Sequence, residues 1–399
     1  MSRFPQYNVN SEHQLITRQN TYVLDRKLVT IHTEDRDVSQ WPNANYFEIT
    51  LPATLTNVQS LRLVEIEFPT NQYVFSNYQQ NTKLQFYLIP SLNTDVAKYV
   101  ALAANVSTPY EIQIQEGFFT PSQMAMEIEN LMNKSVTEYL IQSGLPLLSA
   151  TYTFFKVYYD QVGQKMYFGN TFDRFEFKFN ESPIYDVSCS ALATAGSNPM
   201  ALNQPNNVFQ QYANWGLPAY LGFNKLVYTP ISKTTPVSFE YANYQWLIPE
   251  NGPQLPVVQT ATCYYIVAPY TINIFGDSAV YMELEKFNSY DELKPYPMST
   301  NSTYKNDYNG STNSAFAKIA ITAQPNGQIF DSRNGYLQNV SQYNPTIDKI
   351  RKLKFKFRYH DGRLVDFRDT NFNFTIAFNQ LKNEINRDYQ VRTPYEYNL

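Results

Sequence analysis

The chain of 399 residues has little charge and few of the residues that build chemical sites. Charged side chains make up 17% of it, below the roughly 25% of ordinary globular proteins. Its formal net charge is -4 at pH 7. Proteins dedicated to nucleic acids usually carry a strong excess of lysine and arginine. We therefore expect no specific nucleic-acid partner.

Cysteine is scarce, and long apolar runs are missing. Cys189 and Cys263 both lie in apolar surroundings, which favours buried reduced thiols over a disulfide framework or a metal site. The first ten residues lack the apolar core of a signal peptide. No run approaches the roughly 18 apolar residues of a membrane span. These features predict a protein made and kept in a reducing compartment.

Motifs that carry catalysis are also missing. The three histidines, His13, His32 and His360, have no evident partners. His32 and Glu34 form an H-x-E, but the P-C-x-x-C of zinc deaminases is lacking. Metalloprotease, nucleophile-elbow, Walker A and dinucleotide-binding motifs do not occur either. We predict that the protein is not an enzyme, and that it has no catalytic residues, cofactor or metal site.

One acidic cluster leaves an alternative open. Glu34, Asp35 and Asp37 carry the carboxylate oxygens that hard divalent cations prefer. Arg36 lies within the cluster and favours a solvated, ion-paired turn instead. A hydrolase assembled from carboxylates that folding brings together is the least favoured function.

Aromatic residues are abundant, at 16% of the chain, with 33 tyrosines and 27 phenylalanines. Prolines number 23, and asparagine is frequent. Aromatic and β-branched residues interrupted by proline and asparagine favour strands and turns. The composition predicts a mainly β protein.

Alternating polar and apolar residues mark the expected strands. Tyr46–Leu51 alternates until Pro52, which we expect to end the strand, and Leu61–Phe68 alternates again. Strong strands at both ends of the chain suit an antiparallel sandwich in which the two ends share one sheet. The other expected strands are Val29–His32, Lys83–Ile89, Glu111–Gln115, a hairpin of Phe154–Tyr159 and Lys165–Phe168 with Gly163 available for positive φ in its turn, Phe175–Phe179, Cys263–Val267, Thr271–Phe275, Ala279–Phe287, a hairpin of Ala315–Thr322 and Gly327–Phe330, Lys352–Arg358 and Phe372–Phe378.

One amphipathic helix is expected after Thr120. Thr120 and Gln123 form a capping box around Pro121 at the first helical position. An apolar stripe follows at helical spacing, in Met124, Ile128, Leu131 and Met132. This stripe indicates core packing rather than a methionine-rich binding groove.

The expected organisation is an N-terminal arm, a sandwich core and a C-terminal tail. Residues 1–27 are polar and predict either a disordered tail or an extended arm that lies on a neighbouring subunit. Residues 28–385 form the core, with the helix and a hairpin inserted at about 110–230, and residues 386–399 form the tail. Long loops are expected over Pro90–Pro109, Ser188–Asn214, Pro230–Pro256 and Ser289–Asn313.

A basic strand face near the end of the chain is the candidate partner contact. Lys352, Lys354, Lys356 and Arg358 share one face of their strand. Four cations in a row repel one another unless water or an anionic surface covers them. Solvation is one interpretation. The other is docking onto an acidic protein surface, a phospholipid headgroup layer or packaged DNA.

Several stretches together resemble a known family. IHTEDRD, a Trp-Pro-Asn turn and YFEITLPATLTNVQSLRLVEIEFPT resemble the start of minor capsid proteins of large nucleocytoplasmic DNA viruses. EIQIQEGFFTPSQMAMEIENLMN, LGF at Leu221–Phe223 and KLKFKFRYHDGRLVDFRDTNFNFTIAF are similar too.

This resemblance implies a jelly-roll-like antiparallel β-sandwich with no enzymatic activity and no small-molecule substrate. It implies a virion structural protein that cements or supports major capsid capsomers and is assembled in the host cytoplasm. Its partners would be the major capsid protein and other minor capsid proteins, with contact to an inner membrane also allowed. The alternative function is a surface β-sandwich that binds carbohydrate or a receptor through exposed tyrosine and tryptophan side chains.

Overall fold

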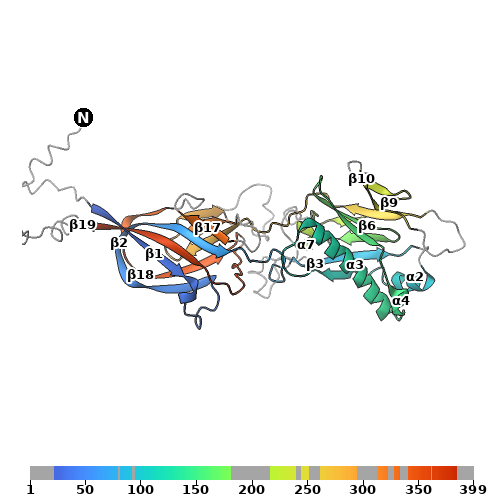
Figure 1. The fold of residues 1–399 in the computed structure, drawn as a ribbon, viewed down its shortest axis with the longest axis horizontal. Coiled ribbons are helices and arrows are strands. Elements are labelled where there is room, and N and C mark those ends of the chain that lie inside the picture. Colours follow the sequence, from blue (N-terminus) through green and yellow to red (C-terminus); the bar gives the residue numbers. More distant parts are fainter. Residues whose placement is uncertain are drawn as a thin grey trace, which may run out of the picture.

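The computed structural model describes residues 22–79, 81–91, 95–180, 216–239, 244–250, 261–293, 312–321, 328–332, 340–360 and 362–383. These residues form two lobes joined end to end in an elongated molecule (Figure 1). The end lobe contains strands from both ends of the chain, and the middle lobe contains the segment between them. All strand pairs in the described residues are antiparallel. The predicted mainly β, jelly-roll-like class is confirmed.

The end lobe is built on one seven-stranded sheet, with β14 and β15 forming a separate pair. Its strand order is β1-β19-β2-β18-β13-β16, and β17 also pairs with β2. The strands are β1 (Tyr22–His32), β2 (Tyr46–Pro69), β13 (Ala279–Leu284), β14 (Tyr290–Leu293), β15 (Thr312–Ala315), β16 (Ala317–Ala320), β17 (Gln328–Ser332), β18 (Ser341–Arg358) and β19 (Asn373–Asn383). The two ends of the chain therefore share a sheet, as the sequence predicted.

Strand β2 is continuous, so the prediction that Pro52 ends a strand is wrong. Thr50 pairs with Lys352 and Leu55 pairs with Ile350 on β18, which leaves residues 51–54 opposite Arg351 alone. Proline cannot donate a ladder hydrogen bond and is tolerated at a bulge. Pro52 lies in this bulge, where its missing N–H costs no pairing.

The core of the end lobe comes from the alternation that the sequence predicted on β18 and β19. Phe355 and Phe357 are buried and pack on Phe374, whose ring centroid lies 4.9 Å from that of Phe355. Phe47 of β2 completes the layer, 5.4 Å from Phe355. These edge-to-face and tilted contacts are favourable aromatic geometries.

The middle lobe contains two four-stranded sheets and a hairpin, with helices beside them (Figure 1). The sheet orders are β5-β6-β12-β9 and β4-β3-β7-β8, and the hairpin is β10-β11. The elements are β3 (Lys83–Ile89), α2 (Val96–Ala103), β4 (Tyr110–Gln113), α3 (Pro121–Gln142), α4 (Leu147–Ala150), β5 (Phe155–Asp160), β6 (Lys165–Asn170), β7 (Arg174–Lys178), α7 (Leu217–Tyr220), β8 (Val227–Tyr228), β9 (Ile231–Lys233), β10 (Val237–Phe239), β11 (Tyr244–Leu247) and β12 (Cys263–Val267).

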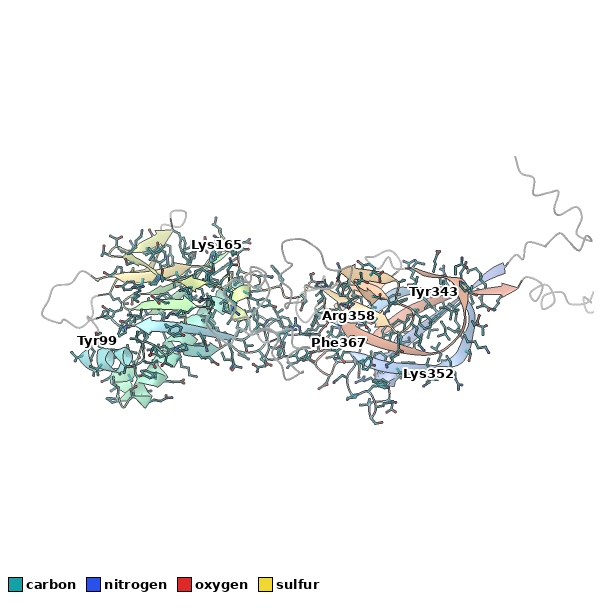
Figure 2. All side chains as sticks on the ribbon, turned by 180° about the vertical axis from the view of Figure 1, so that it is seen from behind. Tyr99, Lys165, Tyr343, Lys352, Arg358 and Phe367 are labelled. Carbon is teal, nitrogen blue, oxygen red and sulfur yellow. The ribbon has the colours of Figure 1, made fainter. Side chains whose placement is uncertain are left out.

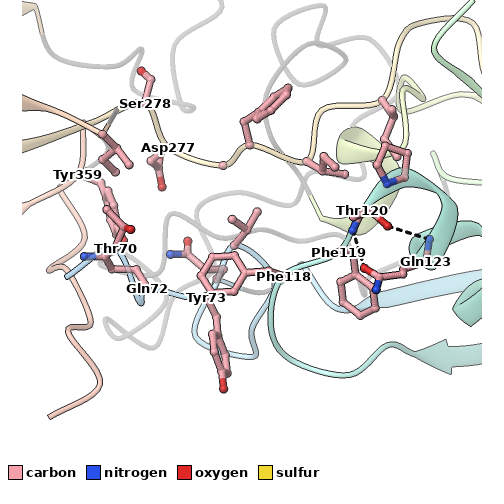
Figure 3. A pocket seen from close by; sticks show the side chains of 18 of the residues that line it. Thr70, Gln72, Tyr73, Phe118, Phe119, Thr120, Gln123, Asp277, Ser278 and Tyr359 are labelled. Atoms are coloured by element: carbon pink, nitrogen blue, oxygen red, sulfur yellow. Dashed lines mark hydrogen bonds between the residues drawn. The ribbon is translucent and has the colours of Figure 1, made fainter. Parts of the chain in front are cut away.

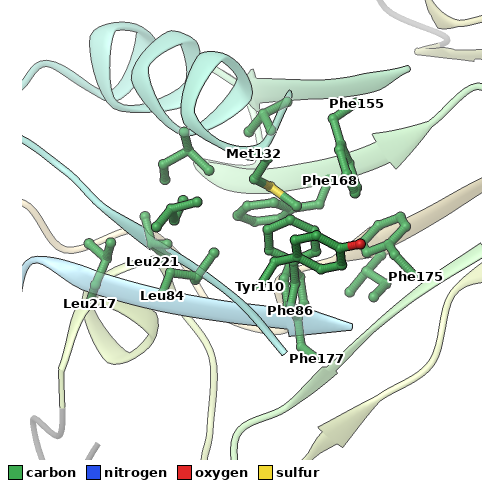
Figure 4. Packing of buried hydrophobic residues seen from close by; sticks show 14 of the residues in the cluster. Leu84, Phe86, Tyr110, Met132, Phe155, Phe168, Phe175, Phe177, Leu217 and Leu221 are labelled. Carbon is green, nitrogen blue, oxygen red and sulfur yellow. The ribbon is translucent and has the colours of Figure 1, made fainter. Parts of the chain in front are cut away.

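An aromatic core fills the middle lobe (Figure 4). Phe86, Phe155, Phe168 and Phe177 are completely buried in it. Helix α3 covers this core with its apolar stripe, since Met124, Ile128 and Met132 are also buried. The predicted hairpin of β5 and β6 and the predicted aromatic strand β7 are confirmed, and the methionine stripe is core.

The capping box of α3 is confirmed in detail. The Thr120 hydroxyl accepts a hydrogen bond from the Gln123 amide at 3.3 Å, and the Gln123 side-chain oxygen accepts one from the Thr120 amide at 3.0 Å. We expect Thr120→Ala to lower the free energy of unfolding by about 1 kcal/mol, because an orphan amide of the first turn loses its acceptor. Urea titration followed by circular dichroism measures this. Thr120→Ser keeps the hydroxyl and should match the parent; an equal loss in both variants would contradict the capping role.

Several local predictions are wrong. The loop expected over Pro230–Pro256 contains β9, β10 and β11, and the loop expected over Ser289–Asn313 contains β14. The loop expected over Pro90–Pro109 contains α2, whose start is capped by the Asp95 carboxylate accepting from the Ala97 amide at 3.0 Å. Residues 271–275 are irregular instead of a strand, because the Ile272 amide bonds to the Gln164 carbonyl at 2.9 Å, across from the hairpin turn. Strands β16 and β17 do not form a hairpin, since β16 pairs with β13 and β17 with β2. In the β5–β6 turn, Gln164 and not Gly163 adopts positive φ, at 52°.

The last residues of the predicted N-terminal arm belong to a strand instead. Tyr22–Lys27 belong to β1 and pair with β19, with Tyr22 opposite Asn383. Hydrophobic contact also extends beyond the expected insertion, because the buried cluster of the middle lobe runs from Phe75 to Ala268. Residues 1–21, the tail 386–399, Ser188–Asn214 and Cys189 lie outside the described residues. Cys263 is a buried free thiol, and its burial raises its pKa.

Candidate functional site

The predicted basic strand face lies on β18, between β2 and β13. Each of its lysines has a carboxylate of the same chain beside it. Lys352 Nζ lies 2.6 Å from Glu48 on β2, Lys354 Nζ lies 3.4 Å from Glu285, and Lys356 Nζ lies 3.4 Å from Glu283 on β13. The repulsion that suggested an external anion is therefore relieved within the lobe. Contact of these lysines with a partner stays a prediction.

Arg358 departs from the other three cations because it is buried, with a side chain that is only 2% exposed (Figure 2). Its guanidinium donates from Nε to Glu283 and from Nη1 to Glu292. It also lies over the Tyr281 ring, 5.1 Å from the centroid. Strand β14 supplies Glu292 and closes this end of β18, so Arg358 lies too deep to touch a partner surface. Its burial disfavours the predicted partner contact.

Lys354 is held by aromatic rings as well as by its carboxylate. Its ammonium lies 4.8 Å from the Tyr46 ring centroid and 5.5 Å from that of Trp41. The hydrogen bond to the Tyr46 side chain is the main cause that raises the pKa of Lys354. Cations over aromatic faces are attracted by the ring quadrupole. The predicted face is thus a set of anchored cations rather than free ones.

The acidic turn after β1 is not ion-paired as predicted. Arg36 donates to the carbonyl oxygens of Thr33, Trp41 and Pro42 at 2.6–2.9 Å, and to the Asn371 side chain at 2.7 Å. The Asp37 carboxylate accepts from Ser39, which holds its pKa below the usual range. Through its hydrogen bond to Asn371, Arg36 instead connects the turn to the loop before β19. In the described part of the chain, no three histidine, cysteine or acidic side chains gather as a metal site would require.

A hollow lies at the junction of the lobes (Figure 3). This junction cleft has a volume of about 840 Å³. Its described lining is aromatic, aliphatic and amide-bearing, with Asp277 as its only charged residue. Burial raises the pKa of Tyr359 at its end-lobe wall. The lining residues include Gln72, Tyr73, Val74, Phe118, Phe119, Gln123, Gln164, Ile272, Ile274, Phe275, Asp277 and Tyr359.

Two arginines of the loop between β18 and β19 fix the junction. Arg363 donates to the Gln79 side chain and lies 3.9 Å from Asp277. Arg368 stacks on the Tyr73 ring, 3.8 Å from its centroid, and lies 3.9 Å from Glu116. Two further bonds join the same loop to residues 71–78, from Tyr78 to the Leu364 carbonyl at 3.0 Å and from Asn71 to the Thr370 hydroxyl at 2.6 Å. The sequence analysis did not predict the contacts of these two arginines. Their occurrence close together in GRLVDFRDT was the only local signal.

The arrangement suits binding and positioning more than catalysis. Amide side chains in the cleft can bond to uncharged polar groups, and its rings can cover apolar ones. Asp277, the one carboxylate in the described lining, lies 3.9 Å from Arg363. None of the helices in the described ranges is long and apolar enough to cross a bilayer.

Comparison with known proteins gave matches among solved structures only. No family model matches the chain, and no curated protein matches it. The mavirus penton protein is similar over 90% of this chain and 99% of its own, with 9% identity and a TM-score of 0.39. A chain of the Sputnik virophage is similar over 89% of this chain and 98% of its own, with 11% identity and a TM-score of 0.38. At this level of similarity the function has to be inferred from the residues.

Proposed function

We propose that this chain is a structural protein of an icosahedral virion, a minor capsid protein that cements or supports major capsid capsomers. The observation that carries the proposal is where the family-like stretches lie. The first contains β2 and the end of β1, and the last contains the end of β18 and the first half of β19. These four strands are neighbours in one sheet, in the order β1-β19-β2-β18. Segments from opposite ends of the chain therefore build one structural unit.

The shape of the molecule also supports a bridging role. Two lobes with separate cores stand end to end (Figure 1). Tyr22 pairs with Asn383 at the tip of the end lobe. The predicted arm precedes this pair in the sequence and would contact a neighbouring subunit from that tip.

The carbohydrate-binding alternative gains less from the structure. Trp246 is buried in a cluster with Tyr158, Tyr167 and Phe239. Trp41 is partly covered and lies under Lys354. Stacking on a sugar needs an exposed aromatic face, and neither of these tryptophans presents one. Strong, selective binding on a glycan array would still favour this alternative.

The proposal predicts assembly with capsid protein through the terminal segment. We expect the purified chain to co-migrate with detergent-released major capsid protein from its source particle in size-exclusion chromatography with light scattering. Removal of residues 2–21 should abolish this, because it removes the arm and leaves β1 whole. A variant that lacks residues 386–399 is the control for terminal truncation as such. The proposal would be contradicted if the full-length chain and both truncated variants stayed monomeric and did not co-migrate with capsid protein.

A further inference from the structure

The corner of the middle lobe farthest from the end lobe is apolar and nearly free of charge. It is formed by α2, α4 and the end of α3 (Figure 1), and we call it the helical cap. Tyr99 of α2 is labelled in Figure 2. Residues 99–110 and 139–151 contain no charged side chain, although 17% of the chain is charged. The exposed apolar side chains of the cap are Val96, Val100, Val106, Ile141, Leu147 and Leu148.

The helical cap is held together by specific contacts. The Tyr139 hydroxyl donates to the Ala101 carbonyl at 3.1 Å and joins α3 to α2. Lys98 Nζ donates to the Thr151 carbonyl at 2.8 Å and joins α2 to the residue after α4. Leu102, Leu140 and Ala150 are buried beneath the cap. The exposed side chains therefore stand on a fixed scaffold.

The geometry of the outermost leucines indicates what covers them. Leu147 is 67% exposed and Leu148 is 95% exposed, on a single helical turn. A side chain this exposed projects from the surface, so a protein partner would need a matching recess. A lipid layer needs no matching shape, because it closes around any projecting apolar group. Contiguous exposed apolar patches mark protein or membrane contacts, and the projection favours the membrane.

The charges around the helical cap fit uncharged lipid. Lys134 pairs with Glu138 at 3.7 Å, Asp95 caps α2, and the ammonium of Lys98 is bonded to the chain itself. None of these offers a basic patch for anionic headgroups. The basic strand face cannot provide one here, since it lies in the other lobe and is paired with its own carboxylates.

We propose that the helical cap inserts Leu147 and Leu148 into the surface layer of a phospholipid bilayer. The molecule would then stand on a membrane by its middle lobe, with strands β1 and β19 of the end lobe away from the membrane. This inference gives a partner to one end of the proposed virion protein, but binding to lipid does not depend on capsid protein. The two can therefore fail separately.

Flotation of the full-length protein with phosphatidylcholine vesicles tests the inference. We expect the protein to float with these vesicles, with little change when salt is raised or phosphatidylserine is added. Leu147→Asp with Leu148→Asp should reduce the floating fraction more than about tenfold, because two inserted side chains are lost. The matched control is Leu24→Asp with Leu28→Asp on β1, where both leucines are 51% exposed. This control should float like the parent.

Several outcomes would overturn the inference. One is that the parent protein floats with neither kind of vesicle. Another is that its flotation requires phosphatidylserine and disappears when salt is raised. A third is that the Leu147→Asp/Leu148→Asp variant floats as well as the parent. A dimer in light scattering that the same variant abolishes would assign the cap to a second copy of the chain instead. Thermal unfolding of both variants checks that neither has lost its fold. If the Leu147→Asp/Leu148→Asp variant is unfolded, Leu147→Ser with Leu148→Ser replaces it.

Discussion

Replacement of Arg358 by alanine is expected to lower the free energy of unfolding of the end lobe by about 3–5 kcal/mol. The guanidinium is buried between Glu283 and Glu292, and Glu292 is itself only 7% exposed. Removing the cation leaves Glu292 buried without the guanidinium, beside the Tyr281 side chain and His360, whose Nδ1 lies 3.4 Å away. A buried charge that loses its partner keeps its desolvation cost without the compensating attraction. Chemical denaturation followed by circular dichroism measures the loss.

Two variants separate this cause from loss of volume. Lys352→Ala removes a cation from the same strand face, but that side chain is 60% exposed, so its effect should stay below about 1 kcal/mol. Arg358→Met combined with Glu283→Gln and Glu292→Gln removes the charges together and should recover most of the stability. If the triple variant were as unstable as Arg358→Ala, the uncompensated carboxylates would not be the reason.

Replacement of Phe177 by alanine should lower the free energy of unfolding of the middle lobe by about 3–5 kcal/mol, through lost burial and the cavity left behind. Phe177 is completely buried. Its ring centroid lies 5.0–5.6 Å from those of Phe168, Phe175, Phe179 and Phe223. It therefore links both sheets of the lobe, and its neighbours cannot all relax into the space.

The control for Phe177 is the same change at Phe275, which is 85% exposed. Phe275→Ala should alter the free energy of unfolding by less than about 0.5 kcal/mol. Differential scanning calorimetry adds a sharper test, because the two lobes have separate cores. If they unfold in two transitions, Phe177→Ala should move one and Arg358→Ala the other. Movement of the same transition alone by both variants would contradict the assignment of these residues to separate cores.

Features encoded by neighbouring residues were predictable. The Thr120 capping box and the alternation of Leu353, Phe355 and Phe357 depend on spacing within a few positions, and both occur as expected. The end of a strand at Pro52 was not predictable in this way. Proline usually interrupts a ladder, and only the register of β2 against β18 creates the bulge that accommodates it.

The candidate site was less predictable because distant segments build it. Alternation placed Arg358 with the lysines, yet its partners Glu283 and Glu292 lie 75 and 66 residues away. Nothing near Arg358 in the sequence signals that β14 covers it. The junction cleft likewise combines residues from Thr70 to Tyr359. The helical cap was hidden for another reason, since α2 lies in a stretch whose prolines and asparagines suggested a loop.

The pairing of the chain ends also dictates an order of events during synthesis. Thr30 on β1 and Thr375 on β19, whose hydroxyls lie 3.0 Å apart, are separated by 345 residues. At about 5–20 residues per second, a ribosome needs roughly 20–70 s to make the partner strand after β1 emerges. The buried cluster of the middle lobe is complete by Ala268. This lobe can therefore fold on the nascent chain while β1 and β2 still lack their partner strand β19. Synthesis of β19, rather than local sequence, then sets when the end lobe closes.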